Sequence, residues 1–274
     1  MRCGLGEGLF VSKEGRGWWV DIPRKLLLSN DGSENAVFAL PEVASKVLAV
    51  QEQSVTLATE SGLSCLELDT GRYETLCVAP PLSWKGEGRS NDACILSNGD
   101  ILVGRMDLDP RENTGDVVRY RNGVSEVILT GIAIPNTFVE LSLEQRTSLL
   151  ISDSLAQITW CYETESLSAL NGSPQIWHDF RCHKGTPDGG VLASDDHVYM
   201  AMWGAGCVTK LNRYGEIIAE VAVPALQPTS VQENNSFSEL WITTATEGMT
   251  QSQLSQYAGS GQLLNLPLRT FFDD

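Results

Sequence analysis

The sequence has little positive charge. It contains 19 lysines and arginines against 35 aspartates and glutamates, and its formal net charge is −16 at pH 7. An acidic surface of this size repels phosphate backbones, which argues against a nucleic-acid partner. The charge suits a cation site, although an acidic surface that only keeps a protein in solution has the same composition.

Long hydrophobic runs are also missing, since none reaches the roughly 18 residues that a membrane-spanning helix needs. The first eight residues lack the apolar core of a signal peptide. The 7 cysteines are odd in number and widely spaced, and they form no C-x-x-C pair. This pattern argues against a disulfide framework and against structural zinc, and it indicates a reducing compartment. We therefore expect a cytoplasmic protein with no membrane partner.

Several catalytic motifs are absent. There is no G-x-S-x-G elbow, so a serine hydrolase of that type lacks its nucleophile. The glycine-rich start does not open a strand–helix unit, so it does not indicate a dinucleotide loop. The three histidines, His178, His183 and His197, form no H-x-x-x-H pair, and His197 begins an expected strand. A structural role is the plainer interpretation of His197.

What the sequence does contain is a repeat of short β-rich runs, separated by Gly, Asn, Asp and Pro turns. The run centres lie about 38 to 49 residues apart, which is the length of one four-stranded propeller blade. Six runs predict an all-β fold, a single six-bladed β-propeller domain over residues 1–274, with two β-sandwiches as the alternative. The centres are Trp19, Leu57, Leu102, Leu150, Tyr199 and Trp241.

Polar residues recur about a dozen positions before most of these centres, beside turn-forming residues. Equivalent positions in successive blades surround one axis, so we expect these side chains at one end of the ring. Converging carboxylates repel each other unless a cation neutralises them, and Glu, Asn and Asp are oxygen donors that favour Ca²⁺, Mg²⁺ or Mn²⁺. For any one position alone, an ordinary turn residue is the plainer interpretation. The polar residues are Glu7, Asn91, Asn136, Asp188, Thr229 and Ser230.

The same positions belong to five paired segments that follow one another along nearly the whole chain. In this order, the set resembles the family that includes regucalcin (senescence marker protein), bacterial gluconolactonases and related lactonases. The segments are Leu5-Gly6-Glu7-Gly8 with Trp19-Val20-Asp21-Ile22, Arg89-Ser90-Asn91-Asp92 with Gly104-Arg105-Met106, Ile134-Pro135-Asn136 with Ile151-Ser152-Asp153-Ser154, Thr186-Pro187-Asp188-Gly189 with Trp203-Gly204-Ala205-Gly206, and Pro228-Thr229-Ser230 with Leu240-Trp241-Ile242-Thr243-Thr244-Ala245.

The resemblance implies one divalent metal bound by Glu7, Asn136 and Asp188. Ca²⁺ is expected first, with Zn²⁺, Mg²⁺ and Mn²⁺ as alternatives. The resemblance also implies that Arg89 and Asn91 contact the substrate and that Asp188 helps to activate the attacking water. The implied reaction is gluconolactonase-like, metal-dependent hydrolysis of a sugar lactone whose carbonyl the metal polarises.

The chain departs from the family pattern in three places. Only six residues precede Glu7, so we expect either that residues 261–266 alone close the last blade or that the true start of the protein lies further upstream. Ala93 replaces a usual glycine, and Arg105 replaces a common threonine. Beyond Arg105 two acidic residues are candidates for a substrate contact: we take Asp109, and Asp107 is the alternative.

Two other functions remain open. One is a calcium-binding regulatory propeller without turnover, and the other is a metal-dependent esterase or lactonase that acts on a non-sugar substrate. A purely structural ion site has no need of an arginine. The presence of Arg89 together with Asn91 and Asp188 therefore favours an enzyme that binds a small-molecule lactone.

Overall fold

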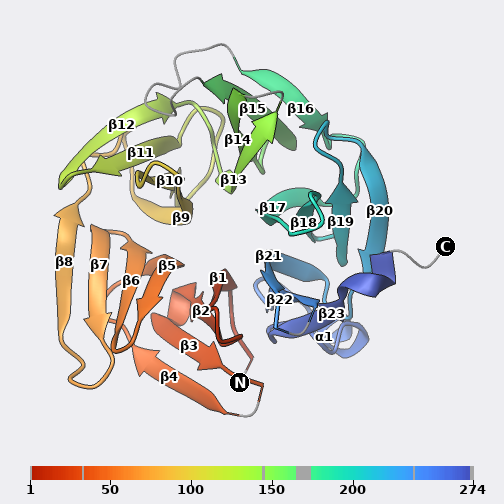
Figure 1. The fold of residues 1–274 in the computed structure, drawn as a ribbon, viewed down its shortest axis with the longest axis horizontal. Coiled ribbons are helices and arrows are strands. Elements are labelled where there is room, and N and C mark those ends of the chain that lie inside the picture. Colours follow the sequence, from red (N-terminus) through yellow and green to blue (C-terminus); the bar gives the residue numbers. More distant parts are fainter. Residues whose placement is uncertain (1, 33, 144–145, 165–173, 237, 272–274) are drawn as a thin grey trace. The chain divides into compact units, whose positions relative to one another are not determined.

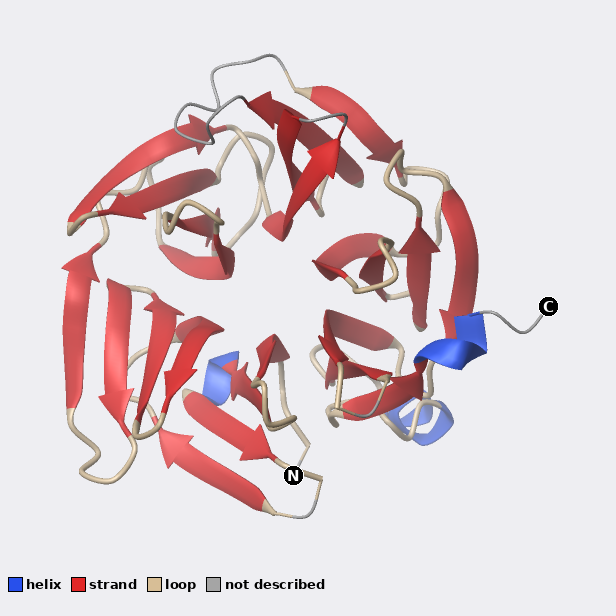
Figure 2. Ribbon diagram, in the orientation of Figure 1, coloured by secondary structure: helices blue, strands red, loops and turns tan. Residues whose placement is uncertain are grey.

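The computed structural model describes residues 2–32, 34–143, 146–164, 174–236 and 238–271. These residues form mainly short β-strands, with one α-helix, α1 (Gln251–Gln256), and two 3-10 turns, η1 (Ile22–Arg24) and η2 (Leu268–Phe271) (Figure 2). Within this described part of the chain, no helix has the length and apolar character needed to cross a membrane.

The strands form six antiparallel sheets in which strands consecutive in the chain are neighbours (Figure 1). All six predicted run centres fall on the second strand of a sheet. The six sheets therefore confirm the six predicted blades. The chain divides into two compact units, Met1–Pro41 with His183–Asp274 and Glu42–Cys182. The predicted single domain over residues 1–274 stays a prediction.

The first unit contains three sheets. Strand β21 contacts β1 on one neighbouring sheet and β17 on the other. The three sheets are β1 (Gly6–Val11), β2 (Gly17–Asp21), β3 (Leu26–Asn30) and β4 (Asn35–Ala39); β17 (Thr186–Leu192), β18 (Val198–Trp203), β19 (Cys207–Leu211) and β20 (Ile217–Ala222); and β21 (Gln227–Asn234), β22 (Glu239–Ala245) and β23 (Leu264–Pro267).

The second unit also contains three sheets, coloured orange through green in Figure 1. Strand β9 contacts β5 on one neighbouring sheet and β13 on the other. The three sheets are β5 (Ala44–Gln51), β6 (Ser54–Thr59), β7 (Gly62–Glu67) and β8 (Tyr73–Val78); β9 (Gly88–Ile95), β10 (Ile101–Asp107), β11 (Asp116–Arg121) and β12 (Val124–Thr130); and β13 (Pro135–Leu143), β14 (Arg146–Asp153), β15 (Ile158–Thr164) and β16 (Gln175–Asp179).

Apolar side chains fill the space between neighbouring sheets within each unit. Leu102 of β10 packs in one buried cluster with Leu149 and Ile151 of β14. In the first unit, Tyr199 of β18 shares a cluster with Ile242 of β22. The outermost strands β4 and β20 instead alternate between more and less exposed residues, as expected for strands with only one covered face. These second strands are therefore packed more completely than the outermost strands.

The C-terminal segment completes the last sheet, as the sequence predicts. Strand β23 (Leu264–Pro267) pairs with β22 as its third strand. Near the other end of the chain, Leu5 makes a single bridge to Ala245, and the Cys3 backbone N–H donates to the Gly261 carbonyl at 2.6 Å. Residues 3–5 thus contribute backbone contacts to this sheet, and the C-terminal strand supplies the pairing.

Candidate active site

The first strand of every sheet contains a β-bulge, a place where its register against the second strand shifts. The shifts lie between Glu7 and Phe10, Ala44 and Lys46, Ser90 and Ala93, Asn136 and Val139, Pro187 and Gly190, and Pro228 and Ser230. A bulge adds a residue to one strand and re-aims the neighbouring side chains. The polar residues singled out in the sequence lie at these shifts. Their recurrence about a dozen residues before each run centre is therefore a structural repeat.

Glu7 and Asp188 lie at the bulges of β1 and β17 in the first unit. Their exposed fractions are 7% and 6%, so both carboxylates are largely removed from solvent. The Glu7 Oε2 accepts the backbone N–H of Gly8 at 2.9 Å. Gly8 has a φ of +63°, a conformation that glycine adopts without a steric cost. This local turn orients the Glu7 carboxylate at the bulge.

Strand β21 joins the strands of these two carboxylates. The Thr229 Oγ1 donates to the Gly6 carbonyl at 2.5 Å, which fixes β21 against β1. On the other side, a Cβ added to Gly189 would lie 2.9 Å from the Thr229 carbonyl oxygen and 2.9 Å from the Ser230 Cα. Only glycine allows this close approach of β17 to β21. The backbone beside Glu7 and the backbone beside Asp188 are thus held against one short segment, Thr229–Ser230.

In the second unit, hydrogen bonds link the predicted residues Arg89, Asn91 and Asn136. The Arg89 Nη1 donates to the Asn91 Oδ1 at 2.8 Å, and the Asn91 Nδ2 donates to the Pro135 carbonyl at 3.1 Å. The next residue, Asn136, donates from its Nδ2 to the Ser154 Oγ at 2.9 Å. Because its Nδ2 is engaged in this way, the Asn136 Oδ1 is the atom able to bind a cation. The structure therefore brings these three residues together.

The two acidic candidates beyond Arg105 have different environments. Asp109 follows the end of β10, its side chain is 86% exposed, and its Oδ2 lies 3.6 Å from the Arg111 Nε. Asp107 is the last residue of β10 and is only 4% exposed. Its Oδ1 accepts the Asp109 backbone N–H at 3.0 Å, whereas its Oδ2 has no hydrogen-bond partner among the described residues.

Arg105 itself has a structural role. It lies directly opposite Asp116 on β11, and its Nε and Nη2 donate to the two Asp116 carboxylate oxygens at 2.7 and 2.6 Å. Its Nη1 also donates to the Pro80 carbonyl at 2.6 Å. These partners hold the buried guanidinium in one orientation. Removing one member of a buried ion pair is strongly destabilising, so Arg105 stabilises the fold. The arginine that replaces the common threonine thus forms a buried ion pair with the neighbouring strand.

None of the polar residues predicted from the sequence lies in the second sheet, but the structure places two polar side chains at its bulge. Ser45 lies at the bulge of β5, and Lys46 beside it forms an ion pair with Asp92, Nζ to Oδ1, at 3.0 Å. Asp92 is the neighbour of Asn91. The signal for Ser45 was present, since Ser45 stands twelve residues before Leu57, in phase with the other polar positions. Lys46 had no such signal, because an ion pair between strands of different sheets does not follow a fixed spacing in the sequence.

Buried serine hydroxyls also lie at these bulges. The Oγ atoms of Ser45, Ser90 and Ser230 are buried and have no hydrogen-bond partner within the described residues. A buried polar atom without a partner costs free energy, so such atoms usually serve a ligand, a water molecule or an ion. In each unit, these hydroxyls give the bulges beside the candidate residues a polar environment.

Comparison with known proteins identifies the family. The model of the SMP-30/gluconolactonase/LRE-like region matches residues 5–246. The chain belongs to this family. It is 26% identical over 254 residues to pentonolactonase XacC of Haloferax volcanii, covering 89% of this chain and 82% of that protein. It is 24% identical over 267 residues to L-arabinolactonase of Azospirillum brasilense, covering 94% of this chain and 86% of that protein.

A solved structure shows the fold of this family member. A calcium-binding protein, regucalcin, from Agrobacterium tumefaciens matches with a TM-score of 0.88 at 24% sequence identity, covering 97% of this chain and 90% of that chain. Together with the six antiparallel sheets, this likeness shows that the chain has the fold of a six-bladed β-propeller. The predicted fold class and the predicted family resemblance are both confirmed.

Proposed function

We propose that this protein hydrolyses a sugar lactone in a metal-dependent reaction. Membership of the family and the names of its lactonase relatives support a hydrolase that acts on a small-molecule lactone. The observation that carries the proposal is that Glu7, Asn136 and Asp188 are each buried at the same bulge of a first strand. In a β-propeller the first strands of the blades line one central axis, so side chains at equivalent bulges are expected to face it.

The proposed metal ligands are Glu7, Asn136 and Asp188. Two carboxylates and one amide form a set of oxygen donors that suits Ca²⁺ first, with Mg²⁺, Mn²⁺ and Zn²⁺ as alternatives. The burial of both carboxylates supports a neighbouring positive charge, since a buried carboxylate without one is strongly disfavoured. A divalent ion bound by these residues would polarise the carbonyl of a lactone.

The protein's own side chains supply the rest of the chemistry. The Asp188 carboxylate takes a proton from the water that attacks the carbonyl carbon. The Arg89 guanidinium, held by Asn91, donates a hydrogen bond to a substrate hydroxyl or to the oxygen on which negative charge develops. The Asn91 amide helps to orient the hydroxyl groups of the sugar. The bond between the carbonyl carbon and the ring oxygen then breaks, the ring oxygen takes the proton from Asp188, and the product is the open hydroxy acid.

An acidic side chain near the end of β10 is proposed as a further substrate contact. The sequence prediction took Asp109, with Asp107 as the alternative. The burial of Asp107 and its Oδ2 without a hydrogen-bond partner among the described residues support Asp107 for this role. We keep Asp109, which is highly exposed, as the alternative.

The proposal also includes one propeller domain over residues 1–274 and a cytoplasmic location. The seven cysteines all lie among the described residues and form no disulfide there, which agrees with a reducing compartment. The strongly negative net charge supports a small-molecule substrate over a nucleic-acid partner.

A hydrolysis screen tests the function. Chelator-treated protein is supplied with Ca²⁺, Zn²⁺, Mg²⁺ or Mn²⁺ and offered a panel of aldonolactones and aryl esters, with proton release followed by a pH indicator. We expect hydrolysis of at least one sugar lactone that requires added metal and falls by about 1,000-fold or more in Asp188→Ala. Retained lactonase activity in Asp188→Ala rules out the mechanism. Activity only on the aryl esters indicates a non-sugar substrate, and metal binding without any hydrolysis indicates a regulatory propeller.

A further inference from the structure

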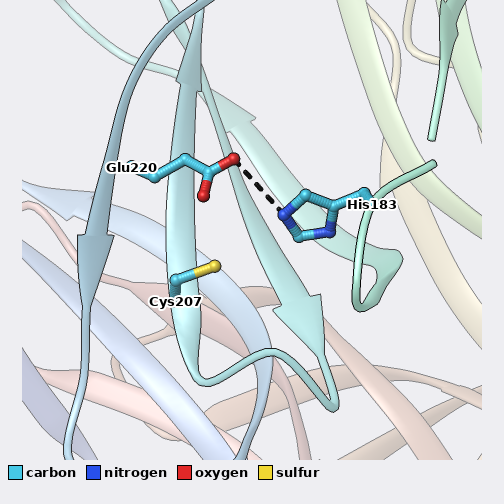
Figure 3. Close-up of side chains that lie close together, drawn as sticks. All are labelled: His183, Cys207 and Glu220. Atoms are coloured by element: carbon cyan, nitrogen blue, oxygen red, sulfur yellow. Dashed lines mark ion pairs between the residues drawn. The ribbon is translucent and has the colours of Figure 1, made fainter.

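Three side chains with different metal-binding atoms gather at one place in the β17–β20 sheet (Figure 3). His183 lies in the turn before β17, Cys207 is the first residue of β19, and Glu220 lies on β20. One ligand atom from each lies within 4.8 Å of the other two. The His183 Nε2 is 3.3 Å from the Glu220 Oε1. The group belongs entirely to the first unit and shares no residue with the proposed oxygen-donor site.

Strand pairing explains why Cys207 and Glu220 meet. On β19 and β20, Cys207 pairs with Ala222 and Thr209 pairs with Glu220. Side chains two residues apart on a strand point to the same face, so Cys207 and Glu220 are diagonal neighbours on one face of the sheet. His183 approaches this face from the turn that leads into β17, and its ring points toward the Glu220 carboxylate (Figure 3).

The imidazole ring of His183 is already oriented by its own turn. Its Nδ1 accepts the Gly185 backbone N–H at 3.1 Å and lies 3.3 Å from the Gly185 carbonyl oxygen. A histidine that binds a metal through Nε2 carries its proton on Nδ1 and usually donates it to a carbonyl or carboxylate. In the tautomer that binds a metal, the Gly185 carbonyl can accept that proton. The turn places the other ring nitrogen, Nε2, on the side of Glu220, 3.3 Å from its Oε1.

The three atoms are a nitrogen, a sulfur and an oxygen, a mixed set that suits zinc better than calcium. Zinc bonds of about 2.0–2.3 Å place tetrahedral ligand atoms about 3.3–3.9 Å apart, a spacing that small side-chain rotations here can reach. Glu220 is exposed and Cys207 is buried, so an ion can enter from the Glu220 side. Burial raises the pKa of the Cys207 thiol to about 11, so without a cation this thiol is neutral at pH 7.

We propose that His183, Cys207 and Glu220 bind a thiolate-binding divalent transition metal, with zinc the best fit, at the edge of the β17–β20 sheet. The plainer interpretation is a histidine–glutamate ion pair beside a free cysteine. The oriented ring and the diagonal cysteine–glutamate pair favour the metal. The bound ion joins the turn before β17 to β19 and β20. Asp188 lies five residues after His183, so the metal also braces the strand that carries this proposed catalytic residue.

Cobalt absorption spectroscopy tests this site independently of lactone hydrolysis. Co²⁺ is titrated into chelator-treated full-length protein, and the near-ultraviolet charge-transfer band of a thiolate–cobalt bond is recorded. The proposed oxygen-donor site has no sulfur and gives no such band. We expect a band that saturates at about one equivalent of Co²⁺ and disappears when Zn²⁺ is added.

Matched variants assign the band to residues. Cys207→Ser and His183→Gln are expected to lose it, whereas Cys182→Ser, which changes the exposed cysteine beside His183, is expected to keep it. Glu220→Gln on the outermost strand is expected to keep the band and to weaken Co²⁺ binding by about tenfold or more. Circular dichroism checks that each variant is folded. The proposal is overturned if the wild-type protein gives no band, if Cys207→Ser keeps it, if Cys182→Ser loses it, or if Glu220→Gln binds Co²⁺ as tightly as the wild type.

Discussion

Arg89 is held by its own strand, with its Nη1 donating to the Asn91 Oδ1 at 2.8 Å and to the Ser90 carbonyl at 2.9 Å. Arg89→Met keeps most of the aliphatic stem and removes the charge. We expect kcat/KM for the lactone to fall by about 100-fold, because we propose that the guanidinium stabilises negative charge in the transition state. We also expect the free energy of unfolding to change by less than about 1 kcal/mol. Steady-state kinetics and urea unfolding measure the two effects.

A matched control for Arg89 is Arg72→Met, which removes an exposed arginine of the same unit whose partners are Glu67 and Glu74. Unchanged kinetics are expected for this control. If Arg89→Met turns over the lactone as fast as the control, the guanidinium has no role in the reaction.

The environments of Asp107 and Asp109 lead to opposite expectations for two similar substitutions. Asp107→Asn alters a buried carboxylate that has an oxygen without a hydrogen-bond partner among the described residues, and we expect kcat/KM to fall by about tenfold or more. Asp109→Asn alters a highly exposed side chain, and we expect a change of less than about twofold. Kinetics on the same lactone compare the two variants. The reverse order would restore Asp109 as the substrate contact.

At the scale of single elements, the bulge of β17 depends on glycine at position 189. A Cβ at this position would lie 2.9 Å from both the Thr229 carbonyl oxygen and the Ser230 Cα, and neither backbone atom can move without shifting β21. We expect Gly189→Ala to lower the free energy of unfolding by about 2 kcal/mol. Urea denaturation measures this loss. Wild-type stability in Gly189→Ala would show that β17 and β21 are not packed this closely.

The turn between β9 and β10 is tied to β11 by Asp100. The Arg121 Nε donates to the Asp100 Oδ1 at 2.5 Å, and its Nη2 donates to the Oδ2. These hydrogen bonds lower the pKa of the Asp100 carboxyl in the folded protein. The carboxyl therefore stabilises the fold above its unfolded pKa of about 4, and this contribution is lost as the pH falls through the lower folded pKa.

The test of this turn is Asp100→Asn, whose free energy of unfolding is followed from pH 7 downwards. We expect the variant to be less stable than the wild type by about 1 kcal/mol at pH 7, because the Arg121 side chain is partly exposed and water screens the ion pair. We also expect the difference to shrink steadily below about pH 4, because the unfolded wild-type chain then binds a proton that the folded carboxyl binds only at lower pH. A difference that does not change with pH would mean that the charge on Asp100 has no part in the stability.

At the scale of the whole molecule, periodicity predicted the architecture. Each run centre, from Trp19 to Trp241, lies on the second strand of a sheet, because the second strand is buried on both faces and its apolar run is the strongest local signal. The polar residues about a dozen positions earlier lie on the first strands. Sequence spacing could find them because each strand pair is a local hairpin with a fixed length.

Sequence spacing does not predict contacts that depend on the register of two strands or on packing between two sheets. Arg105 was visible as a departure from the family pattern, but its ion pair with Asp116 depends on the register of β10 against β11. The contact between Lys46 and Asp92 joins two different sheets. The group of Glu220 with its histidine and cysteine neighbours depends on a diagonal contact across β19 and β20. The sequence argued against structural zinc because the cysteines are widely spaced, and spacing does not report diagonal contacts.

The central claim is that Glu7, Asn136 and Asp188 bind one divalent cation. Each residue lies at the same bulge of a different sheet. Removing any one ligand should therefore weaken binding as much as removing another. The exposed Glu52 offers a control carboxylate in the turn between β5 and β6.

The most direct measurement is calorimetric titration of Ca²⁺ into chelator-treated protein. The account predicts one Ca²⁺ site per chain in the wild type and in Glu52→Gln. It also predicts a loss of affinity of about 100-fold or more in Glu7→Gln, Asn136→Ala and Asp188→Asn alike. An absence of Ca²⁺ binding by the wild type, or wild-type affinity in any of these three variants, would contradict it.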